Sequence, residues 1–177
     1  MAILTSDRAE GVSFRQALPS DKGTIQGWLT APHVTRWTHK VFSRIGAALD
    51  GMESGTDADI LIADIDGRPT GCAYVYSAHG DPSWSAIPDV TPQTRAIDFL
   101  IGEPDVLNRK WGQAMLRALG LRIFADSGID RIVACPLADN WPAVIALKRV
   151  GFREKGRHPD PAMNAMYLTV TPATLKR

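Results

Sequence analysis

One acidic residue, Asp98, interrupts an otherwise apolar stretch within the segment 94–101. A carboxylate in such surroundings can take a proton from a bound ammonium group, directly or through water, or can hold that cation by charge. Strand alternation places Asp98 on one face with Ala96 and Leu100. The alternative is a structural carboxylate that Arg95 or a loop N–H satisfies. Asp98 is therefore the main catalytic candidate of this sequence.

A second candidate is the junction at residues 108–114, where a loop with the basic pair Arg109 and Lys110 leads into a helix. The unpaired N–H groups and positive dipole end of a helix suit a pyrophosphate. Gly112 lets a ligand approach the backbone closely. The alternative is a plain loop–helix junction whose basic pair is solvated. The junction therefore predicts an anion site or, at minimum, the start of a helix.

A third segment, 140–152, begins with Asn140, Trp141 and Pro142 and ends with Gly151 and Phe152. Asparagine is a good N-cap, and proline is favoured in the first helical turn. The residue type at 140 is thus explained by capping alone, although a ligand contact remains open. Trp141 is expected either beside a ligand or in the core.

The hydrophobic pattern predicts the elements that position these residues. Strands are expected at 12–17, 59–65, 70–76, 94–101, 131–135, 152–157 and 163–170, and helices at about 25–29, 41–52, 111–124 and 140–149. The pattern breaks at 32–37, Asp66 and Gly67 indicate a hairpin turn, and 77–93 is a long loop. We expect one α/β (α+β) domain over residues 1–177, with its core at about 12–170.

Composition excludes several classes of protein. With 177 residues, 45% of them hydrophobic, and a net charge of +1, the chain can bury a core, and it has no field that would attract nucleic acid. Its start lacks the features of a signal peptide, and no apolar run is long enough for a membrane span. Cys72 and Cys135 lie in apolar surroundings without metal-ligand spacing. We expect two buried thiols, no metal site and a cytoplasmic location.

The order of elements, together with the segments 108–114 and 140–152, resembles the GNAT family of N-acetyltransferases over residues 12–170. The resemblance implies a mixed, mostly antiparallel sheet of six to seven strands with about four flanking helices. It also implies direct transfer of an acetyl group from acetyl-CoA to a primary amine, with Asp98 as base or cation anchor and a backbone N–H near Leu100 or Ile101 for the oxyanion. The cofactor-binding residues implied are Leu100, Ile101, Arg109, Lys110, Trp111, Gly112, Gln113 and Asn140. A homodimer is compatible with the family, although no interface pattern is legible.

Parts of the sequence are more closely similar to the aminoglycoside 6'-N-acetyltransferases. The similar segments are Trp28-Leu29, Val34, Trp37, Gly71-Cys72-Ala73, Tyr76, Gly80-Asp81-x-x-Trp84, Arg95-Ala96-Ile97-Asp98-x-Leu100, Arg109-Lys110-Trp111-Gly112 and Leu116-Arg117-Ala118-Leu119. They imply an aminoglycoside-like polyamine acceptor with Trp37, Tyr76, Asp81 and Trp84 around it, whereas Trp28 is expected in the core. Acids at 81, 89, 103 and 105 suit a polycation or are simply solvated. Siderophore and lysine acyltransferases share parts of this layout, so a siderophore precursor, a lysine side chain or another small amine is the alternative acceptor.

Two residues depart from the family pattern. Lys110 stands in the place of the first loop glycine, where a positive φ costs more for lysine unless the loop shifts. Leu147 stands where many members have a tyrosine as general acid. The three tyrosines, Tyr74, Tyr76 and Tyr167, are expected in the core or the substrate wall. The departures keep open a second class of protein, an acyl-CoA-binding module with little catalysis.

Overall fold

The computed structural model describes residues 11–37, 40–51 and 59–176. Its elements are β1 (Val12–Gln16), α1 (Lys22–Thr30), α2 (Pro32–Thr35), α3 (Lys40–Gly51), β2 (Asp59–Ile65), β3 (Arg68–Ser77), β4 (Thr94–Ile101), α4 (Trp111–Phe124), β5 (Arg131–Ala134), α5 (Trp141–Arg149), β6 (Arg153–Arg157) and β7 (Met166–Val170). Short 3-10 turns lie at Pro19–Asp21, Pro82–Trp84, Pro104–Val106 and Pro161–Met163. The predicted fold class and the order of its strands and main helices are confirmed.

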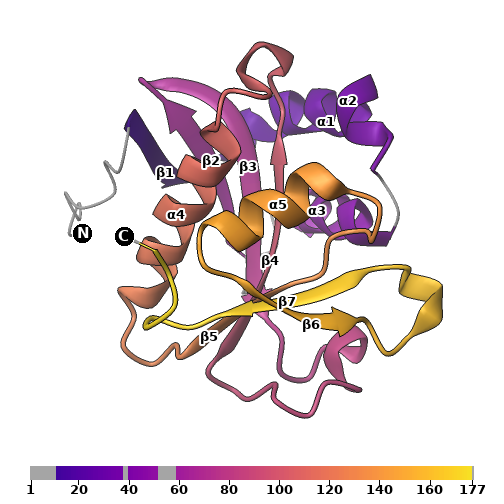
Figure 1. Cartoon of the computed structure of the whole chain (residues 1–177). Coiled ribbons are helices and arrows are strands. Elements are labelled where there is room, and N and C mark those ends of the chain that lie inside the picture. The colour runs from indigo at the N-terminus through magenta and orange to yellow at the C-terminus, as the bar shows by residue number, and fades with distance from the viewer. Residues whose placement is uncertain (1–10, 38–39, 52–58, 177) are drawn as a thin grey trace.

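The seven strands form one sheet in the order β1-β2-β3-β4-β5-β7-β6 (Figure 1). Every neighbouring pair is antiparallel except β4 and β5, which run parallel. The hairpin between β2 and β3 turns through Asp66 and Gly67, whose φ angles are 51° and 82°. Two successive positive φ angles define the turn that matches strand twist, as the sequence predicted.

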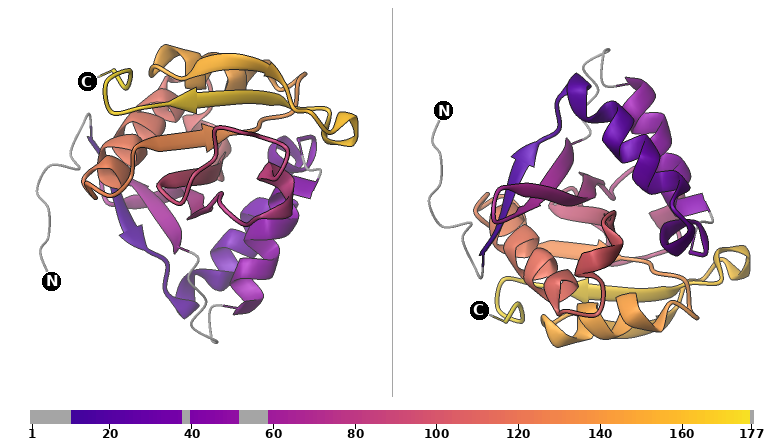
Figure 2. Two further views of the ribbon diagram at one scale, coloured as in Figure 1. Left: turned by 90° about the horizontal axis from the view of Figure 1, so that it is seen from below. Right: turned by 90° about the horizontal axis from the view of Figure 1, so that it is seen from above.

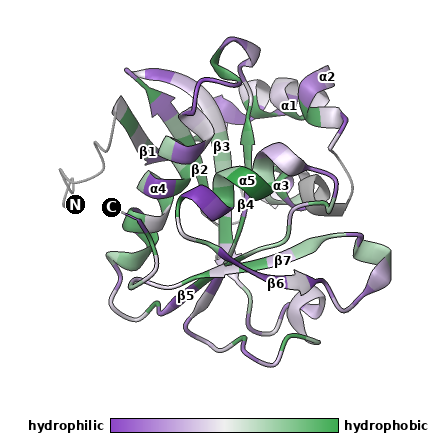
Figure 3. Cartoon of the chain, in the orientation of Figure 1, coloured by the Kyte–Doolittle hydropathy of each residue, from purple (hydrophilic) through white to green (hydrophobic). Residues whose placement is uncertain are grey.

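Helices cover both faces of the sheet (Figure 2). The helices α4 and α5 pack on one face, where Met115, Leu119 and Leu147 join the larger core. The helices α1 and α3 pack on the other face through Ile25 and Ile45. The central strands are therefore buried between two layers and are mainly hydrophobic along their length (Figure 3), whereas the edge strand β6 is exposed.

Several boundaries differ from the expected ones by one to three residues, and two departures from the predicted elements have clear local reasons. The segment after Pro32 forms the short helix α2, with proline at its first position, where its missing N–H is not needed. The last strand begins at Met166 instead of Met163, because residues 161–163 form a 3-10 turn that the Asp160 carboxylate caps. No helix in the described segments is long and apolar enough to cross a bilayer.

Candidate active site

The pairing between β4 and β5 stops before the middle of β4. Pairing in the described chain covers only residues 94–96 of β4 against residues 131–133 of β5. Beyond this point β5 ends at Ala134 and the chain turns away through Pro136. The edge of β4 from Ile97 to Ile101 is thus open toward α5. Two adjoining pockets occupy the opening, and Trp37, Phe99, Asn140 and Ala143 line both of them.

The peptide groups on this open edge are available to a ligand. His33 on α2 donates a hydrogen bond from Nε2 to the carbonyl oxygen of Ile101 at 3.0 Å. That carbonyl therefore faces away from β3. Since alternate residues of a strand direct their peptide groups to the same side, the N–H of Phe99 and of Ile101 face the opening. The N–H of Leu100 faces β3 by the same alternation, which favours Phe99 and Ile101 as oxyanion donors.

Asp98 lies at the deep end of this opening. It is 8% exposed and lines the pocket formed with Ile97, Cys135 and Pro136. Burial raises the pKa of its carboxyl group to about 7, partly offset by the positive charge of Arg44. Such a group can accept a proton near neutral pH.

The structure argues against a purely structural role for Asp98. Its atom Oδ2 is buried and has no hydrogen-bond partner among the described residues. Arg95, one partner considered from sequence, donates instead to the carbonyl oxygen of Pro92 at 3.1 Å. A buried, unsatisfied carboxylate oxygen is costly unless a ligand or a proton satisfies it.

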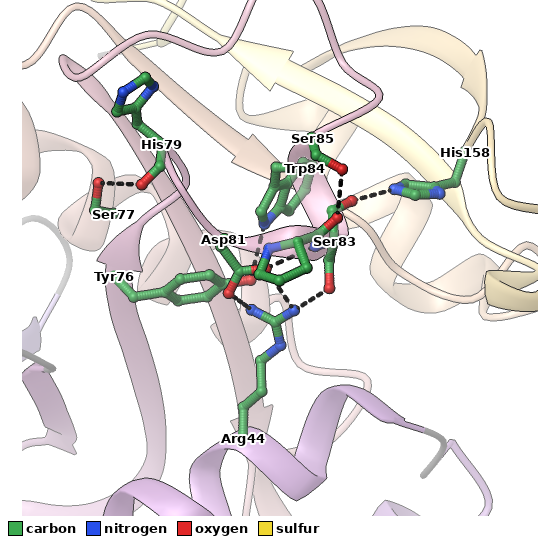
Figure 4. A network of polar contacts seen from close by, with 10 residues as sticks. Arg44, Tyr76, Ser77, His79, Asp81, Ser83, Trp84, Ser85 and His158 are labelled. Carbon is green, nitrogen blue, oxygen red and sulfur yellow. Dashed lines mark hydrogen bonds and ion pairs between the residues drawn. The ribbon is translucent and has the colours of Figure 1, made fainter.

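A polar network joins α3, β3 and the 77–93 loop (Figure 4), and two of its members, Arg44 and Asp81, interact electrostatically with Asp98. Arg44 on α3 donates two hydrogen bonds to the carboxylate of Asp81, at 2.8 and 3.2 Å. Its guanidinium carbon lies 4.7 Å from the ring centroid of Tyr76, a cation–π contact. Trp84 donates from Nε1 to the Tyr76 hydroxyl at 3.1 Å. The structure thus brings Tyr76, Asp81 and Trp84 together around Arg44, a cation that the sequence pattern did not indicate.

The aromatic residues expected around the acceptor take different positions. Trp37 is partly exposed and lines both pockets. Trp84 is only 3% exposed, with its ring packed edge-on against Tyr167 and His158. Trp84 was expected beside the acceptor, but its ring is enclosed by neighbours, and it donates a hydrogen bond to the Tyr76 hydroxyl instead. Trp28 is buried in the core, as predicted.

Three of the other acids flanking the loops are engaged in ion pairs away from this network. Arg68 binds Glu103 and Asp105 at 2.8 Å each, and a terminal nitrogen of Arg131 lies 3.7 Å from the carboxylate of Asp89. The two cysteines are free and buried, as expected. The described residues contain no cluster of side chains that could hold a metal ion.

A third pocket lies at the N-terminus of α4. Asn108, Lys110, Gly112 and Gln113 line it from the loop and the helix, and α5 closes the other side. The residues that α5 contributes are Trp141, Pro142, Ile145, Ala146 and Arg149. Trp141 is 63% exposed, which excludes the core position considered from sequence. This pocket thus contains the N-terminus of α4 and two cationic side chains, Lys110 and Arg149. The combination is suited to binding a polyphosphate.

Two residues expected at this anion site do not line the pocket. Trp111 packs its partly buried ring against the larger core. Arg109 is close enough to Asp105 to help lower the pKa of that carboxyl group, although Arg68 is the main cause. Arg149, on the last turn of α5, lines this pocket although the sequence did not predict it. The spacing of residues within α5 does not show that this turn lies beside the N-terminus of α4.

Lys110 keeps the left-handed conformation that a glycine would adopt freely. Its φ is 64°, and it occupies the N-cap position of α4 without a side-chain cap. The loop has therefore not shifted to relieve the lysine. Left-handed backbone costs a non-glycine residue about 1 kcal/mol or more. The strain is retained at the position where the lysine lines the pocket.

Replacing Lys110 with glycine is expected to stabilise the free protein and weaken the anion site. Relief of strain, offset by the greater freedom of glycine in the unfolded chain, should raise Tm by about 1–3 °C. Loss of one cation should weaken CoA binding by about threefold to tenfold. Thermal unfolding and calorimetric titration with CoA measure the two effects. Asn164→Gly is the control, since asparagine tolerates its φ of 44° and the residue does not line the pocket; a lower Tm for Lys110→Gly contradicts the strain argument.

Asn140 serves as a cap and also reaches the opening. Its side chain accepts a hydrogen bond from the N–H of Ala143 at 3.3 Å, and it lines both pockets beside β4. Leu147 is fully buried in the larger core, so nothing at this position can donate a proton. None of the residues lining the three pockets in the described chain is a tyrosine.

A mixed sheet that opens between two parallel strands, next to a helix N-terminus, defines an acyl-CoA-dependent transferase fold. A model of the acetyltransferase (GNAT) domain matches residues 17–159, and the chain belongs to this family. Aminoglycoside N(6')-acetyltransferases type 1 of Klebsiella pneumoniae and Serratia marcescens are each 26% identical to it over 184 residues, covering 99% of this chain and 90% of theirs.

Solved structures show the same fold. The structure of AAC(6')-Ib with paromomycin and acetyl-CoA superposes with a TM-score of 0.81 at 24% identity, covering 93% of this chain and 96% of that one. An uncharacterized protein of Bacillus halodurans superposes with a TM-score of 0.79 at 19% identity, covering 92% and 85%. These likenesses show the fold, and the family model over residues 17–159 shows that the chain is a GNAT acetyltransferase.

Proposed function

We propose that this protein transfers the acetyl group of acetyl-CoA directly to a primary amine, with an aminoglycoside-like polyamine, acetylated at its 6'-amine, as the acceptor. The observation that carries the proposal is the buried Asp98 carboxylate at the end of an open strand edge. The curated relatives, which are named as aminoglycoside N(6')-acetyltransferases, support this choice of acceptor. The free, buried thiols of Cys72 and Cys135 suit a reducing compartment such as the cytoplasm.

Different residues bind acetyl-CoA at one end of the site and activate the amine at the other. The N-terminus of α4, with Lys110 and Arg149, holds the pyrophosphate, and the open edge of β4 pairs with the extended pantetheine amides. Asp98 accepts a proton from the ammonium group, the amine nitrogen attacks the thioester carbon, and the N–H of Phe99 or Ile101 stabilises the oxyanion. The C–S bond then breaks, and the thiolate leaves without a protein acid, which the modest basicity of a thiolate permits.

A different acceptor and a different class remain as alternatives. A siderophore precursor, a lysine side chain or another small amine would use the same Asp98 chemistry. An acyl-CoA-binding module with little catalysis is favoured by one observation, the buried Leu147 in place of a proton donor. In that case the α4 site would bind CoA although no amine is acetylated.

The deciding experiment measures CoA thiol release from acetyl-CoA by the purified protein with a panel of amines that includes kanamycin and tobramycin. We expect release with an aminoglycoside and a product acetylated at the 6'-amine. Turnover of other amines alone would discard the aminoglycoside and retain the transferase. CoA binding without turnover of any amine would favour the binding module.

A further inference from the structure

The acidic side of the candidate acceptor site is already occupied by a cation of the protein. Arg44 holds both oxygens of Asp81 with its two terminal nitrogens and also donates to the hydroxyl of Ser83 (Figure 4). The side chains of Arg44 and Asp81 are 23% and 25% exposed, so the pair is partly shielded from water. A two-pronged ion pair in this setting is stronger than an ordinary surface pair.

The Arg44–Asp81 pair makes the two nearby carboxylates unequal as partners for an ammonium group. The charge of Asp81 is matched by the guanidinium of Arg44. Asp98 keeps a buried oxygen without a partner among the described residues. Arg44 interacts electrostatically with both carboxylates. An incoming ammonium group therefore finds one carboxylate ready at Asp98, whereas a second ammonium group would have to displace Arg44 from Asp81.

We propose that Arg44 is a specificity-determining residue, whose guanidinium takes the place on Asp81 that a second ammonium group of a polyamine would otherwise occupy. The protein then favours acceptors that carry a neutral group, such as a hydroxyl, near the reacting amine. A polyamine still binds, but it loses affinity because the Arg44–Asp81 pair must break or its second ammonium group must lie elsewhere. This inference rests on the proposed function, since it assigns the acceptor side to the pocket beside Asp98.

A structural role alone makes a different prediction. If Arg44 only ties α3 to the 77–93 loop, its loss lowers stability and affects all acceptors alike. A role in specificity changes the ratio between two acceptors that differ by one charge. The ratio is insensitive to the fraction of folded protein, so the two roles are separable even in a destabilised variant.

The experiment uses kanamycin A and kanamycin B, which share the 6'-amine and differ only in a 2'-hydroxyl against a 2'-ammonium group. Binding to the protein with CoA present is measured by calorimetry, and kcat/KM is measured by thiol release. In Arg44→Gln the preference for kanamycin B over kanamycin A should rise by about tenfold relative to wild type. Arg44→Lys, which keeps the charge, should retain most of the wild-type ratio. Arg153→Gln removes an exposed arginine on β6 and is the matched control.

A second readout is the acidic limb of the pH–kcat/KM profile. Among the described residues, the groups that interact electrostatically with Asp98 are Arg44 from α3, Asp81 from the loop, Tyr74 and Tyr76 from β3, and Cys135 after β5. Arg44 is the only cation of this set, so Arg44→Gln should move the limb to higher pH, and Arg153→Gln should leave it in place. Structural tethering alone would not produce this shift.

The outcomes separate the two proposals. An unchanged binding ratio in Arg44→Gln, with or without a lower Tm, overturns the role of Arg44. If neither kanamycin binds to wild type or to Arg44→Gln, the role of Arg44 is also overturned. Asp81, freed of its arginine, would then not be part of an acceptor subsite. A shifted binding ratio without acetyl transfer supports the role of Arg44 and contradicts the proposed transferase activity.

Discussion

Asp98→Asn is expected to lower kcat/KM for amine acetylation by about a hundredfold to ten-thousandfold while CoA binding is retained. Asparagine has nearly the same shape as aspartate but cannot take the proton of the ammonium group. In the wild-type protein kcat/KM should rise with pH through about 7, the pKa that burial gives the Asp98 carboxyl group, and this limb should disappear in the variant. Steady-state kinetics on both sides of this pKa check both effects.

The same substitution should stabilise the free protein at high pH. The folded-state pKa of about 7 lies above the value of 3.8 for a free aspartate, so the folded state binds more protons between these values. The free energy of unfolding therefore falls as pH rises through this window, by an amount on the order of a few kcal/mol. Relative to wild type, Asp98→Asn should gain about 5 °C in Tm on going from about pH 5 to about pH 8.

The exposed Asp130→Asn serves as the control for both measurements. The comparison uses the change in Tm between the two pH values, so the cost of burying the asparagine amide, which does not depend on pH, cancels. If kcat/KM of Asp98→Asn falls only a few fold, mainly through a higher KM, then Asp98 is a cation anchor and not a base. An unchanged pH limb in Asp98→Asn would remove it from the reaction.

Gly112→Asp is expected to weaken CoA binding by about a hundredfold without lowering Tm. Gly112 is the second residue of α4, and an added Cβ would meet only the Cδ1 atom of Ile101, at an ordinary 3.5 Å. An aspartate in the first turn favours the helix through its dipole, so folding should be unharmed. The same carboxylate competes with and repels the pyrophosphate at the helix N-terminus.

The chain provides a matched control in Gly23→Asp. Gly23 is the second residue of α1 and is exposed, and an added Cβ there would meet no atom of the described chain within 4 Å. It repeats the substitution at an equivalent helical position far along the chain from the candidate CoA site. Calorimetric titration with CoA should leave Gly23→Asp at the wild-type affinity. Equal affinities in both variants would place the pyrophosphate away from α4.

The elements that surround the site could be predicted because their signals are local. Alternation of apolar and polar residues identified β1, and Asp66 with Gly67 identified the hairpin turn, since only such residues adopt two positive φ angles readily. Asn140 was predicted as a cap and does cap α5. Asp98 was conspicuous because its flanking residues are apolar, and that contrast needs no knowledge of contacts.

The tertiary structure decided the properties that depend on distant partners. Arg44 and Asp81 are 37 residues apart, and no periodicity in either segment shows that α3 and the 77–93 loop meet. The burial of Trp84 and the arrival of Arg149 beside α4 depend in the same way on how the layers pack. The sequence by itself determined which residue types line each strand and helix. Packing decided which charges meet, how far water is excluded, and hence the pKa at which Asp98 accepts a proton.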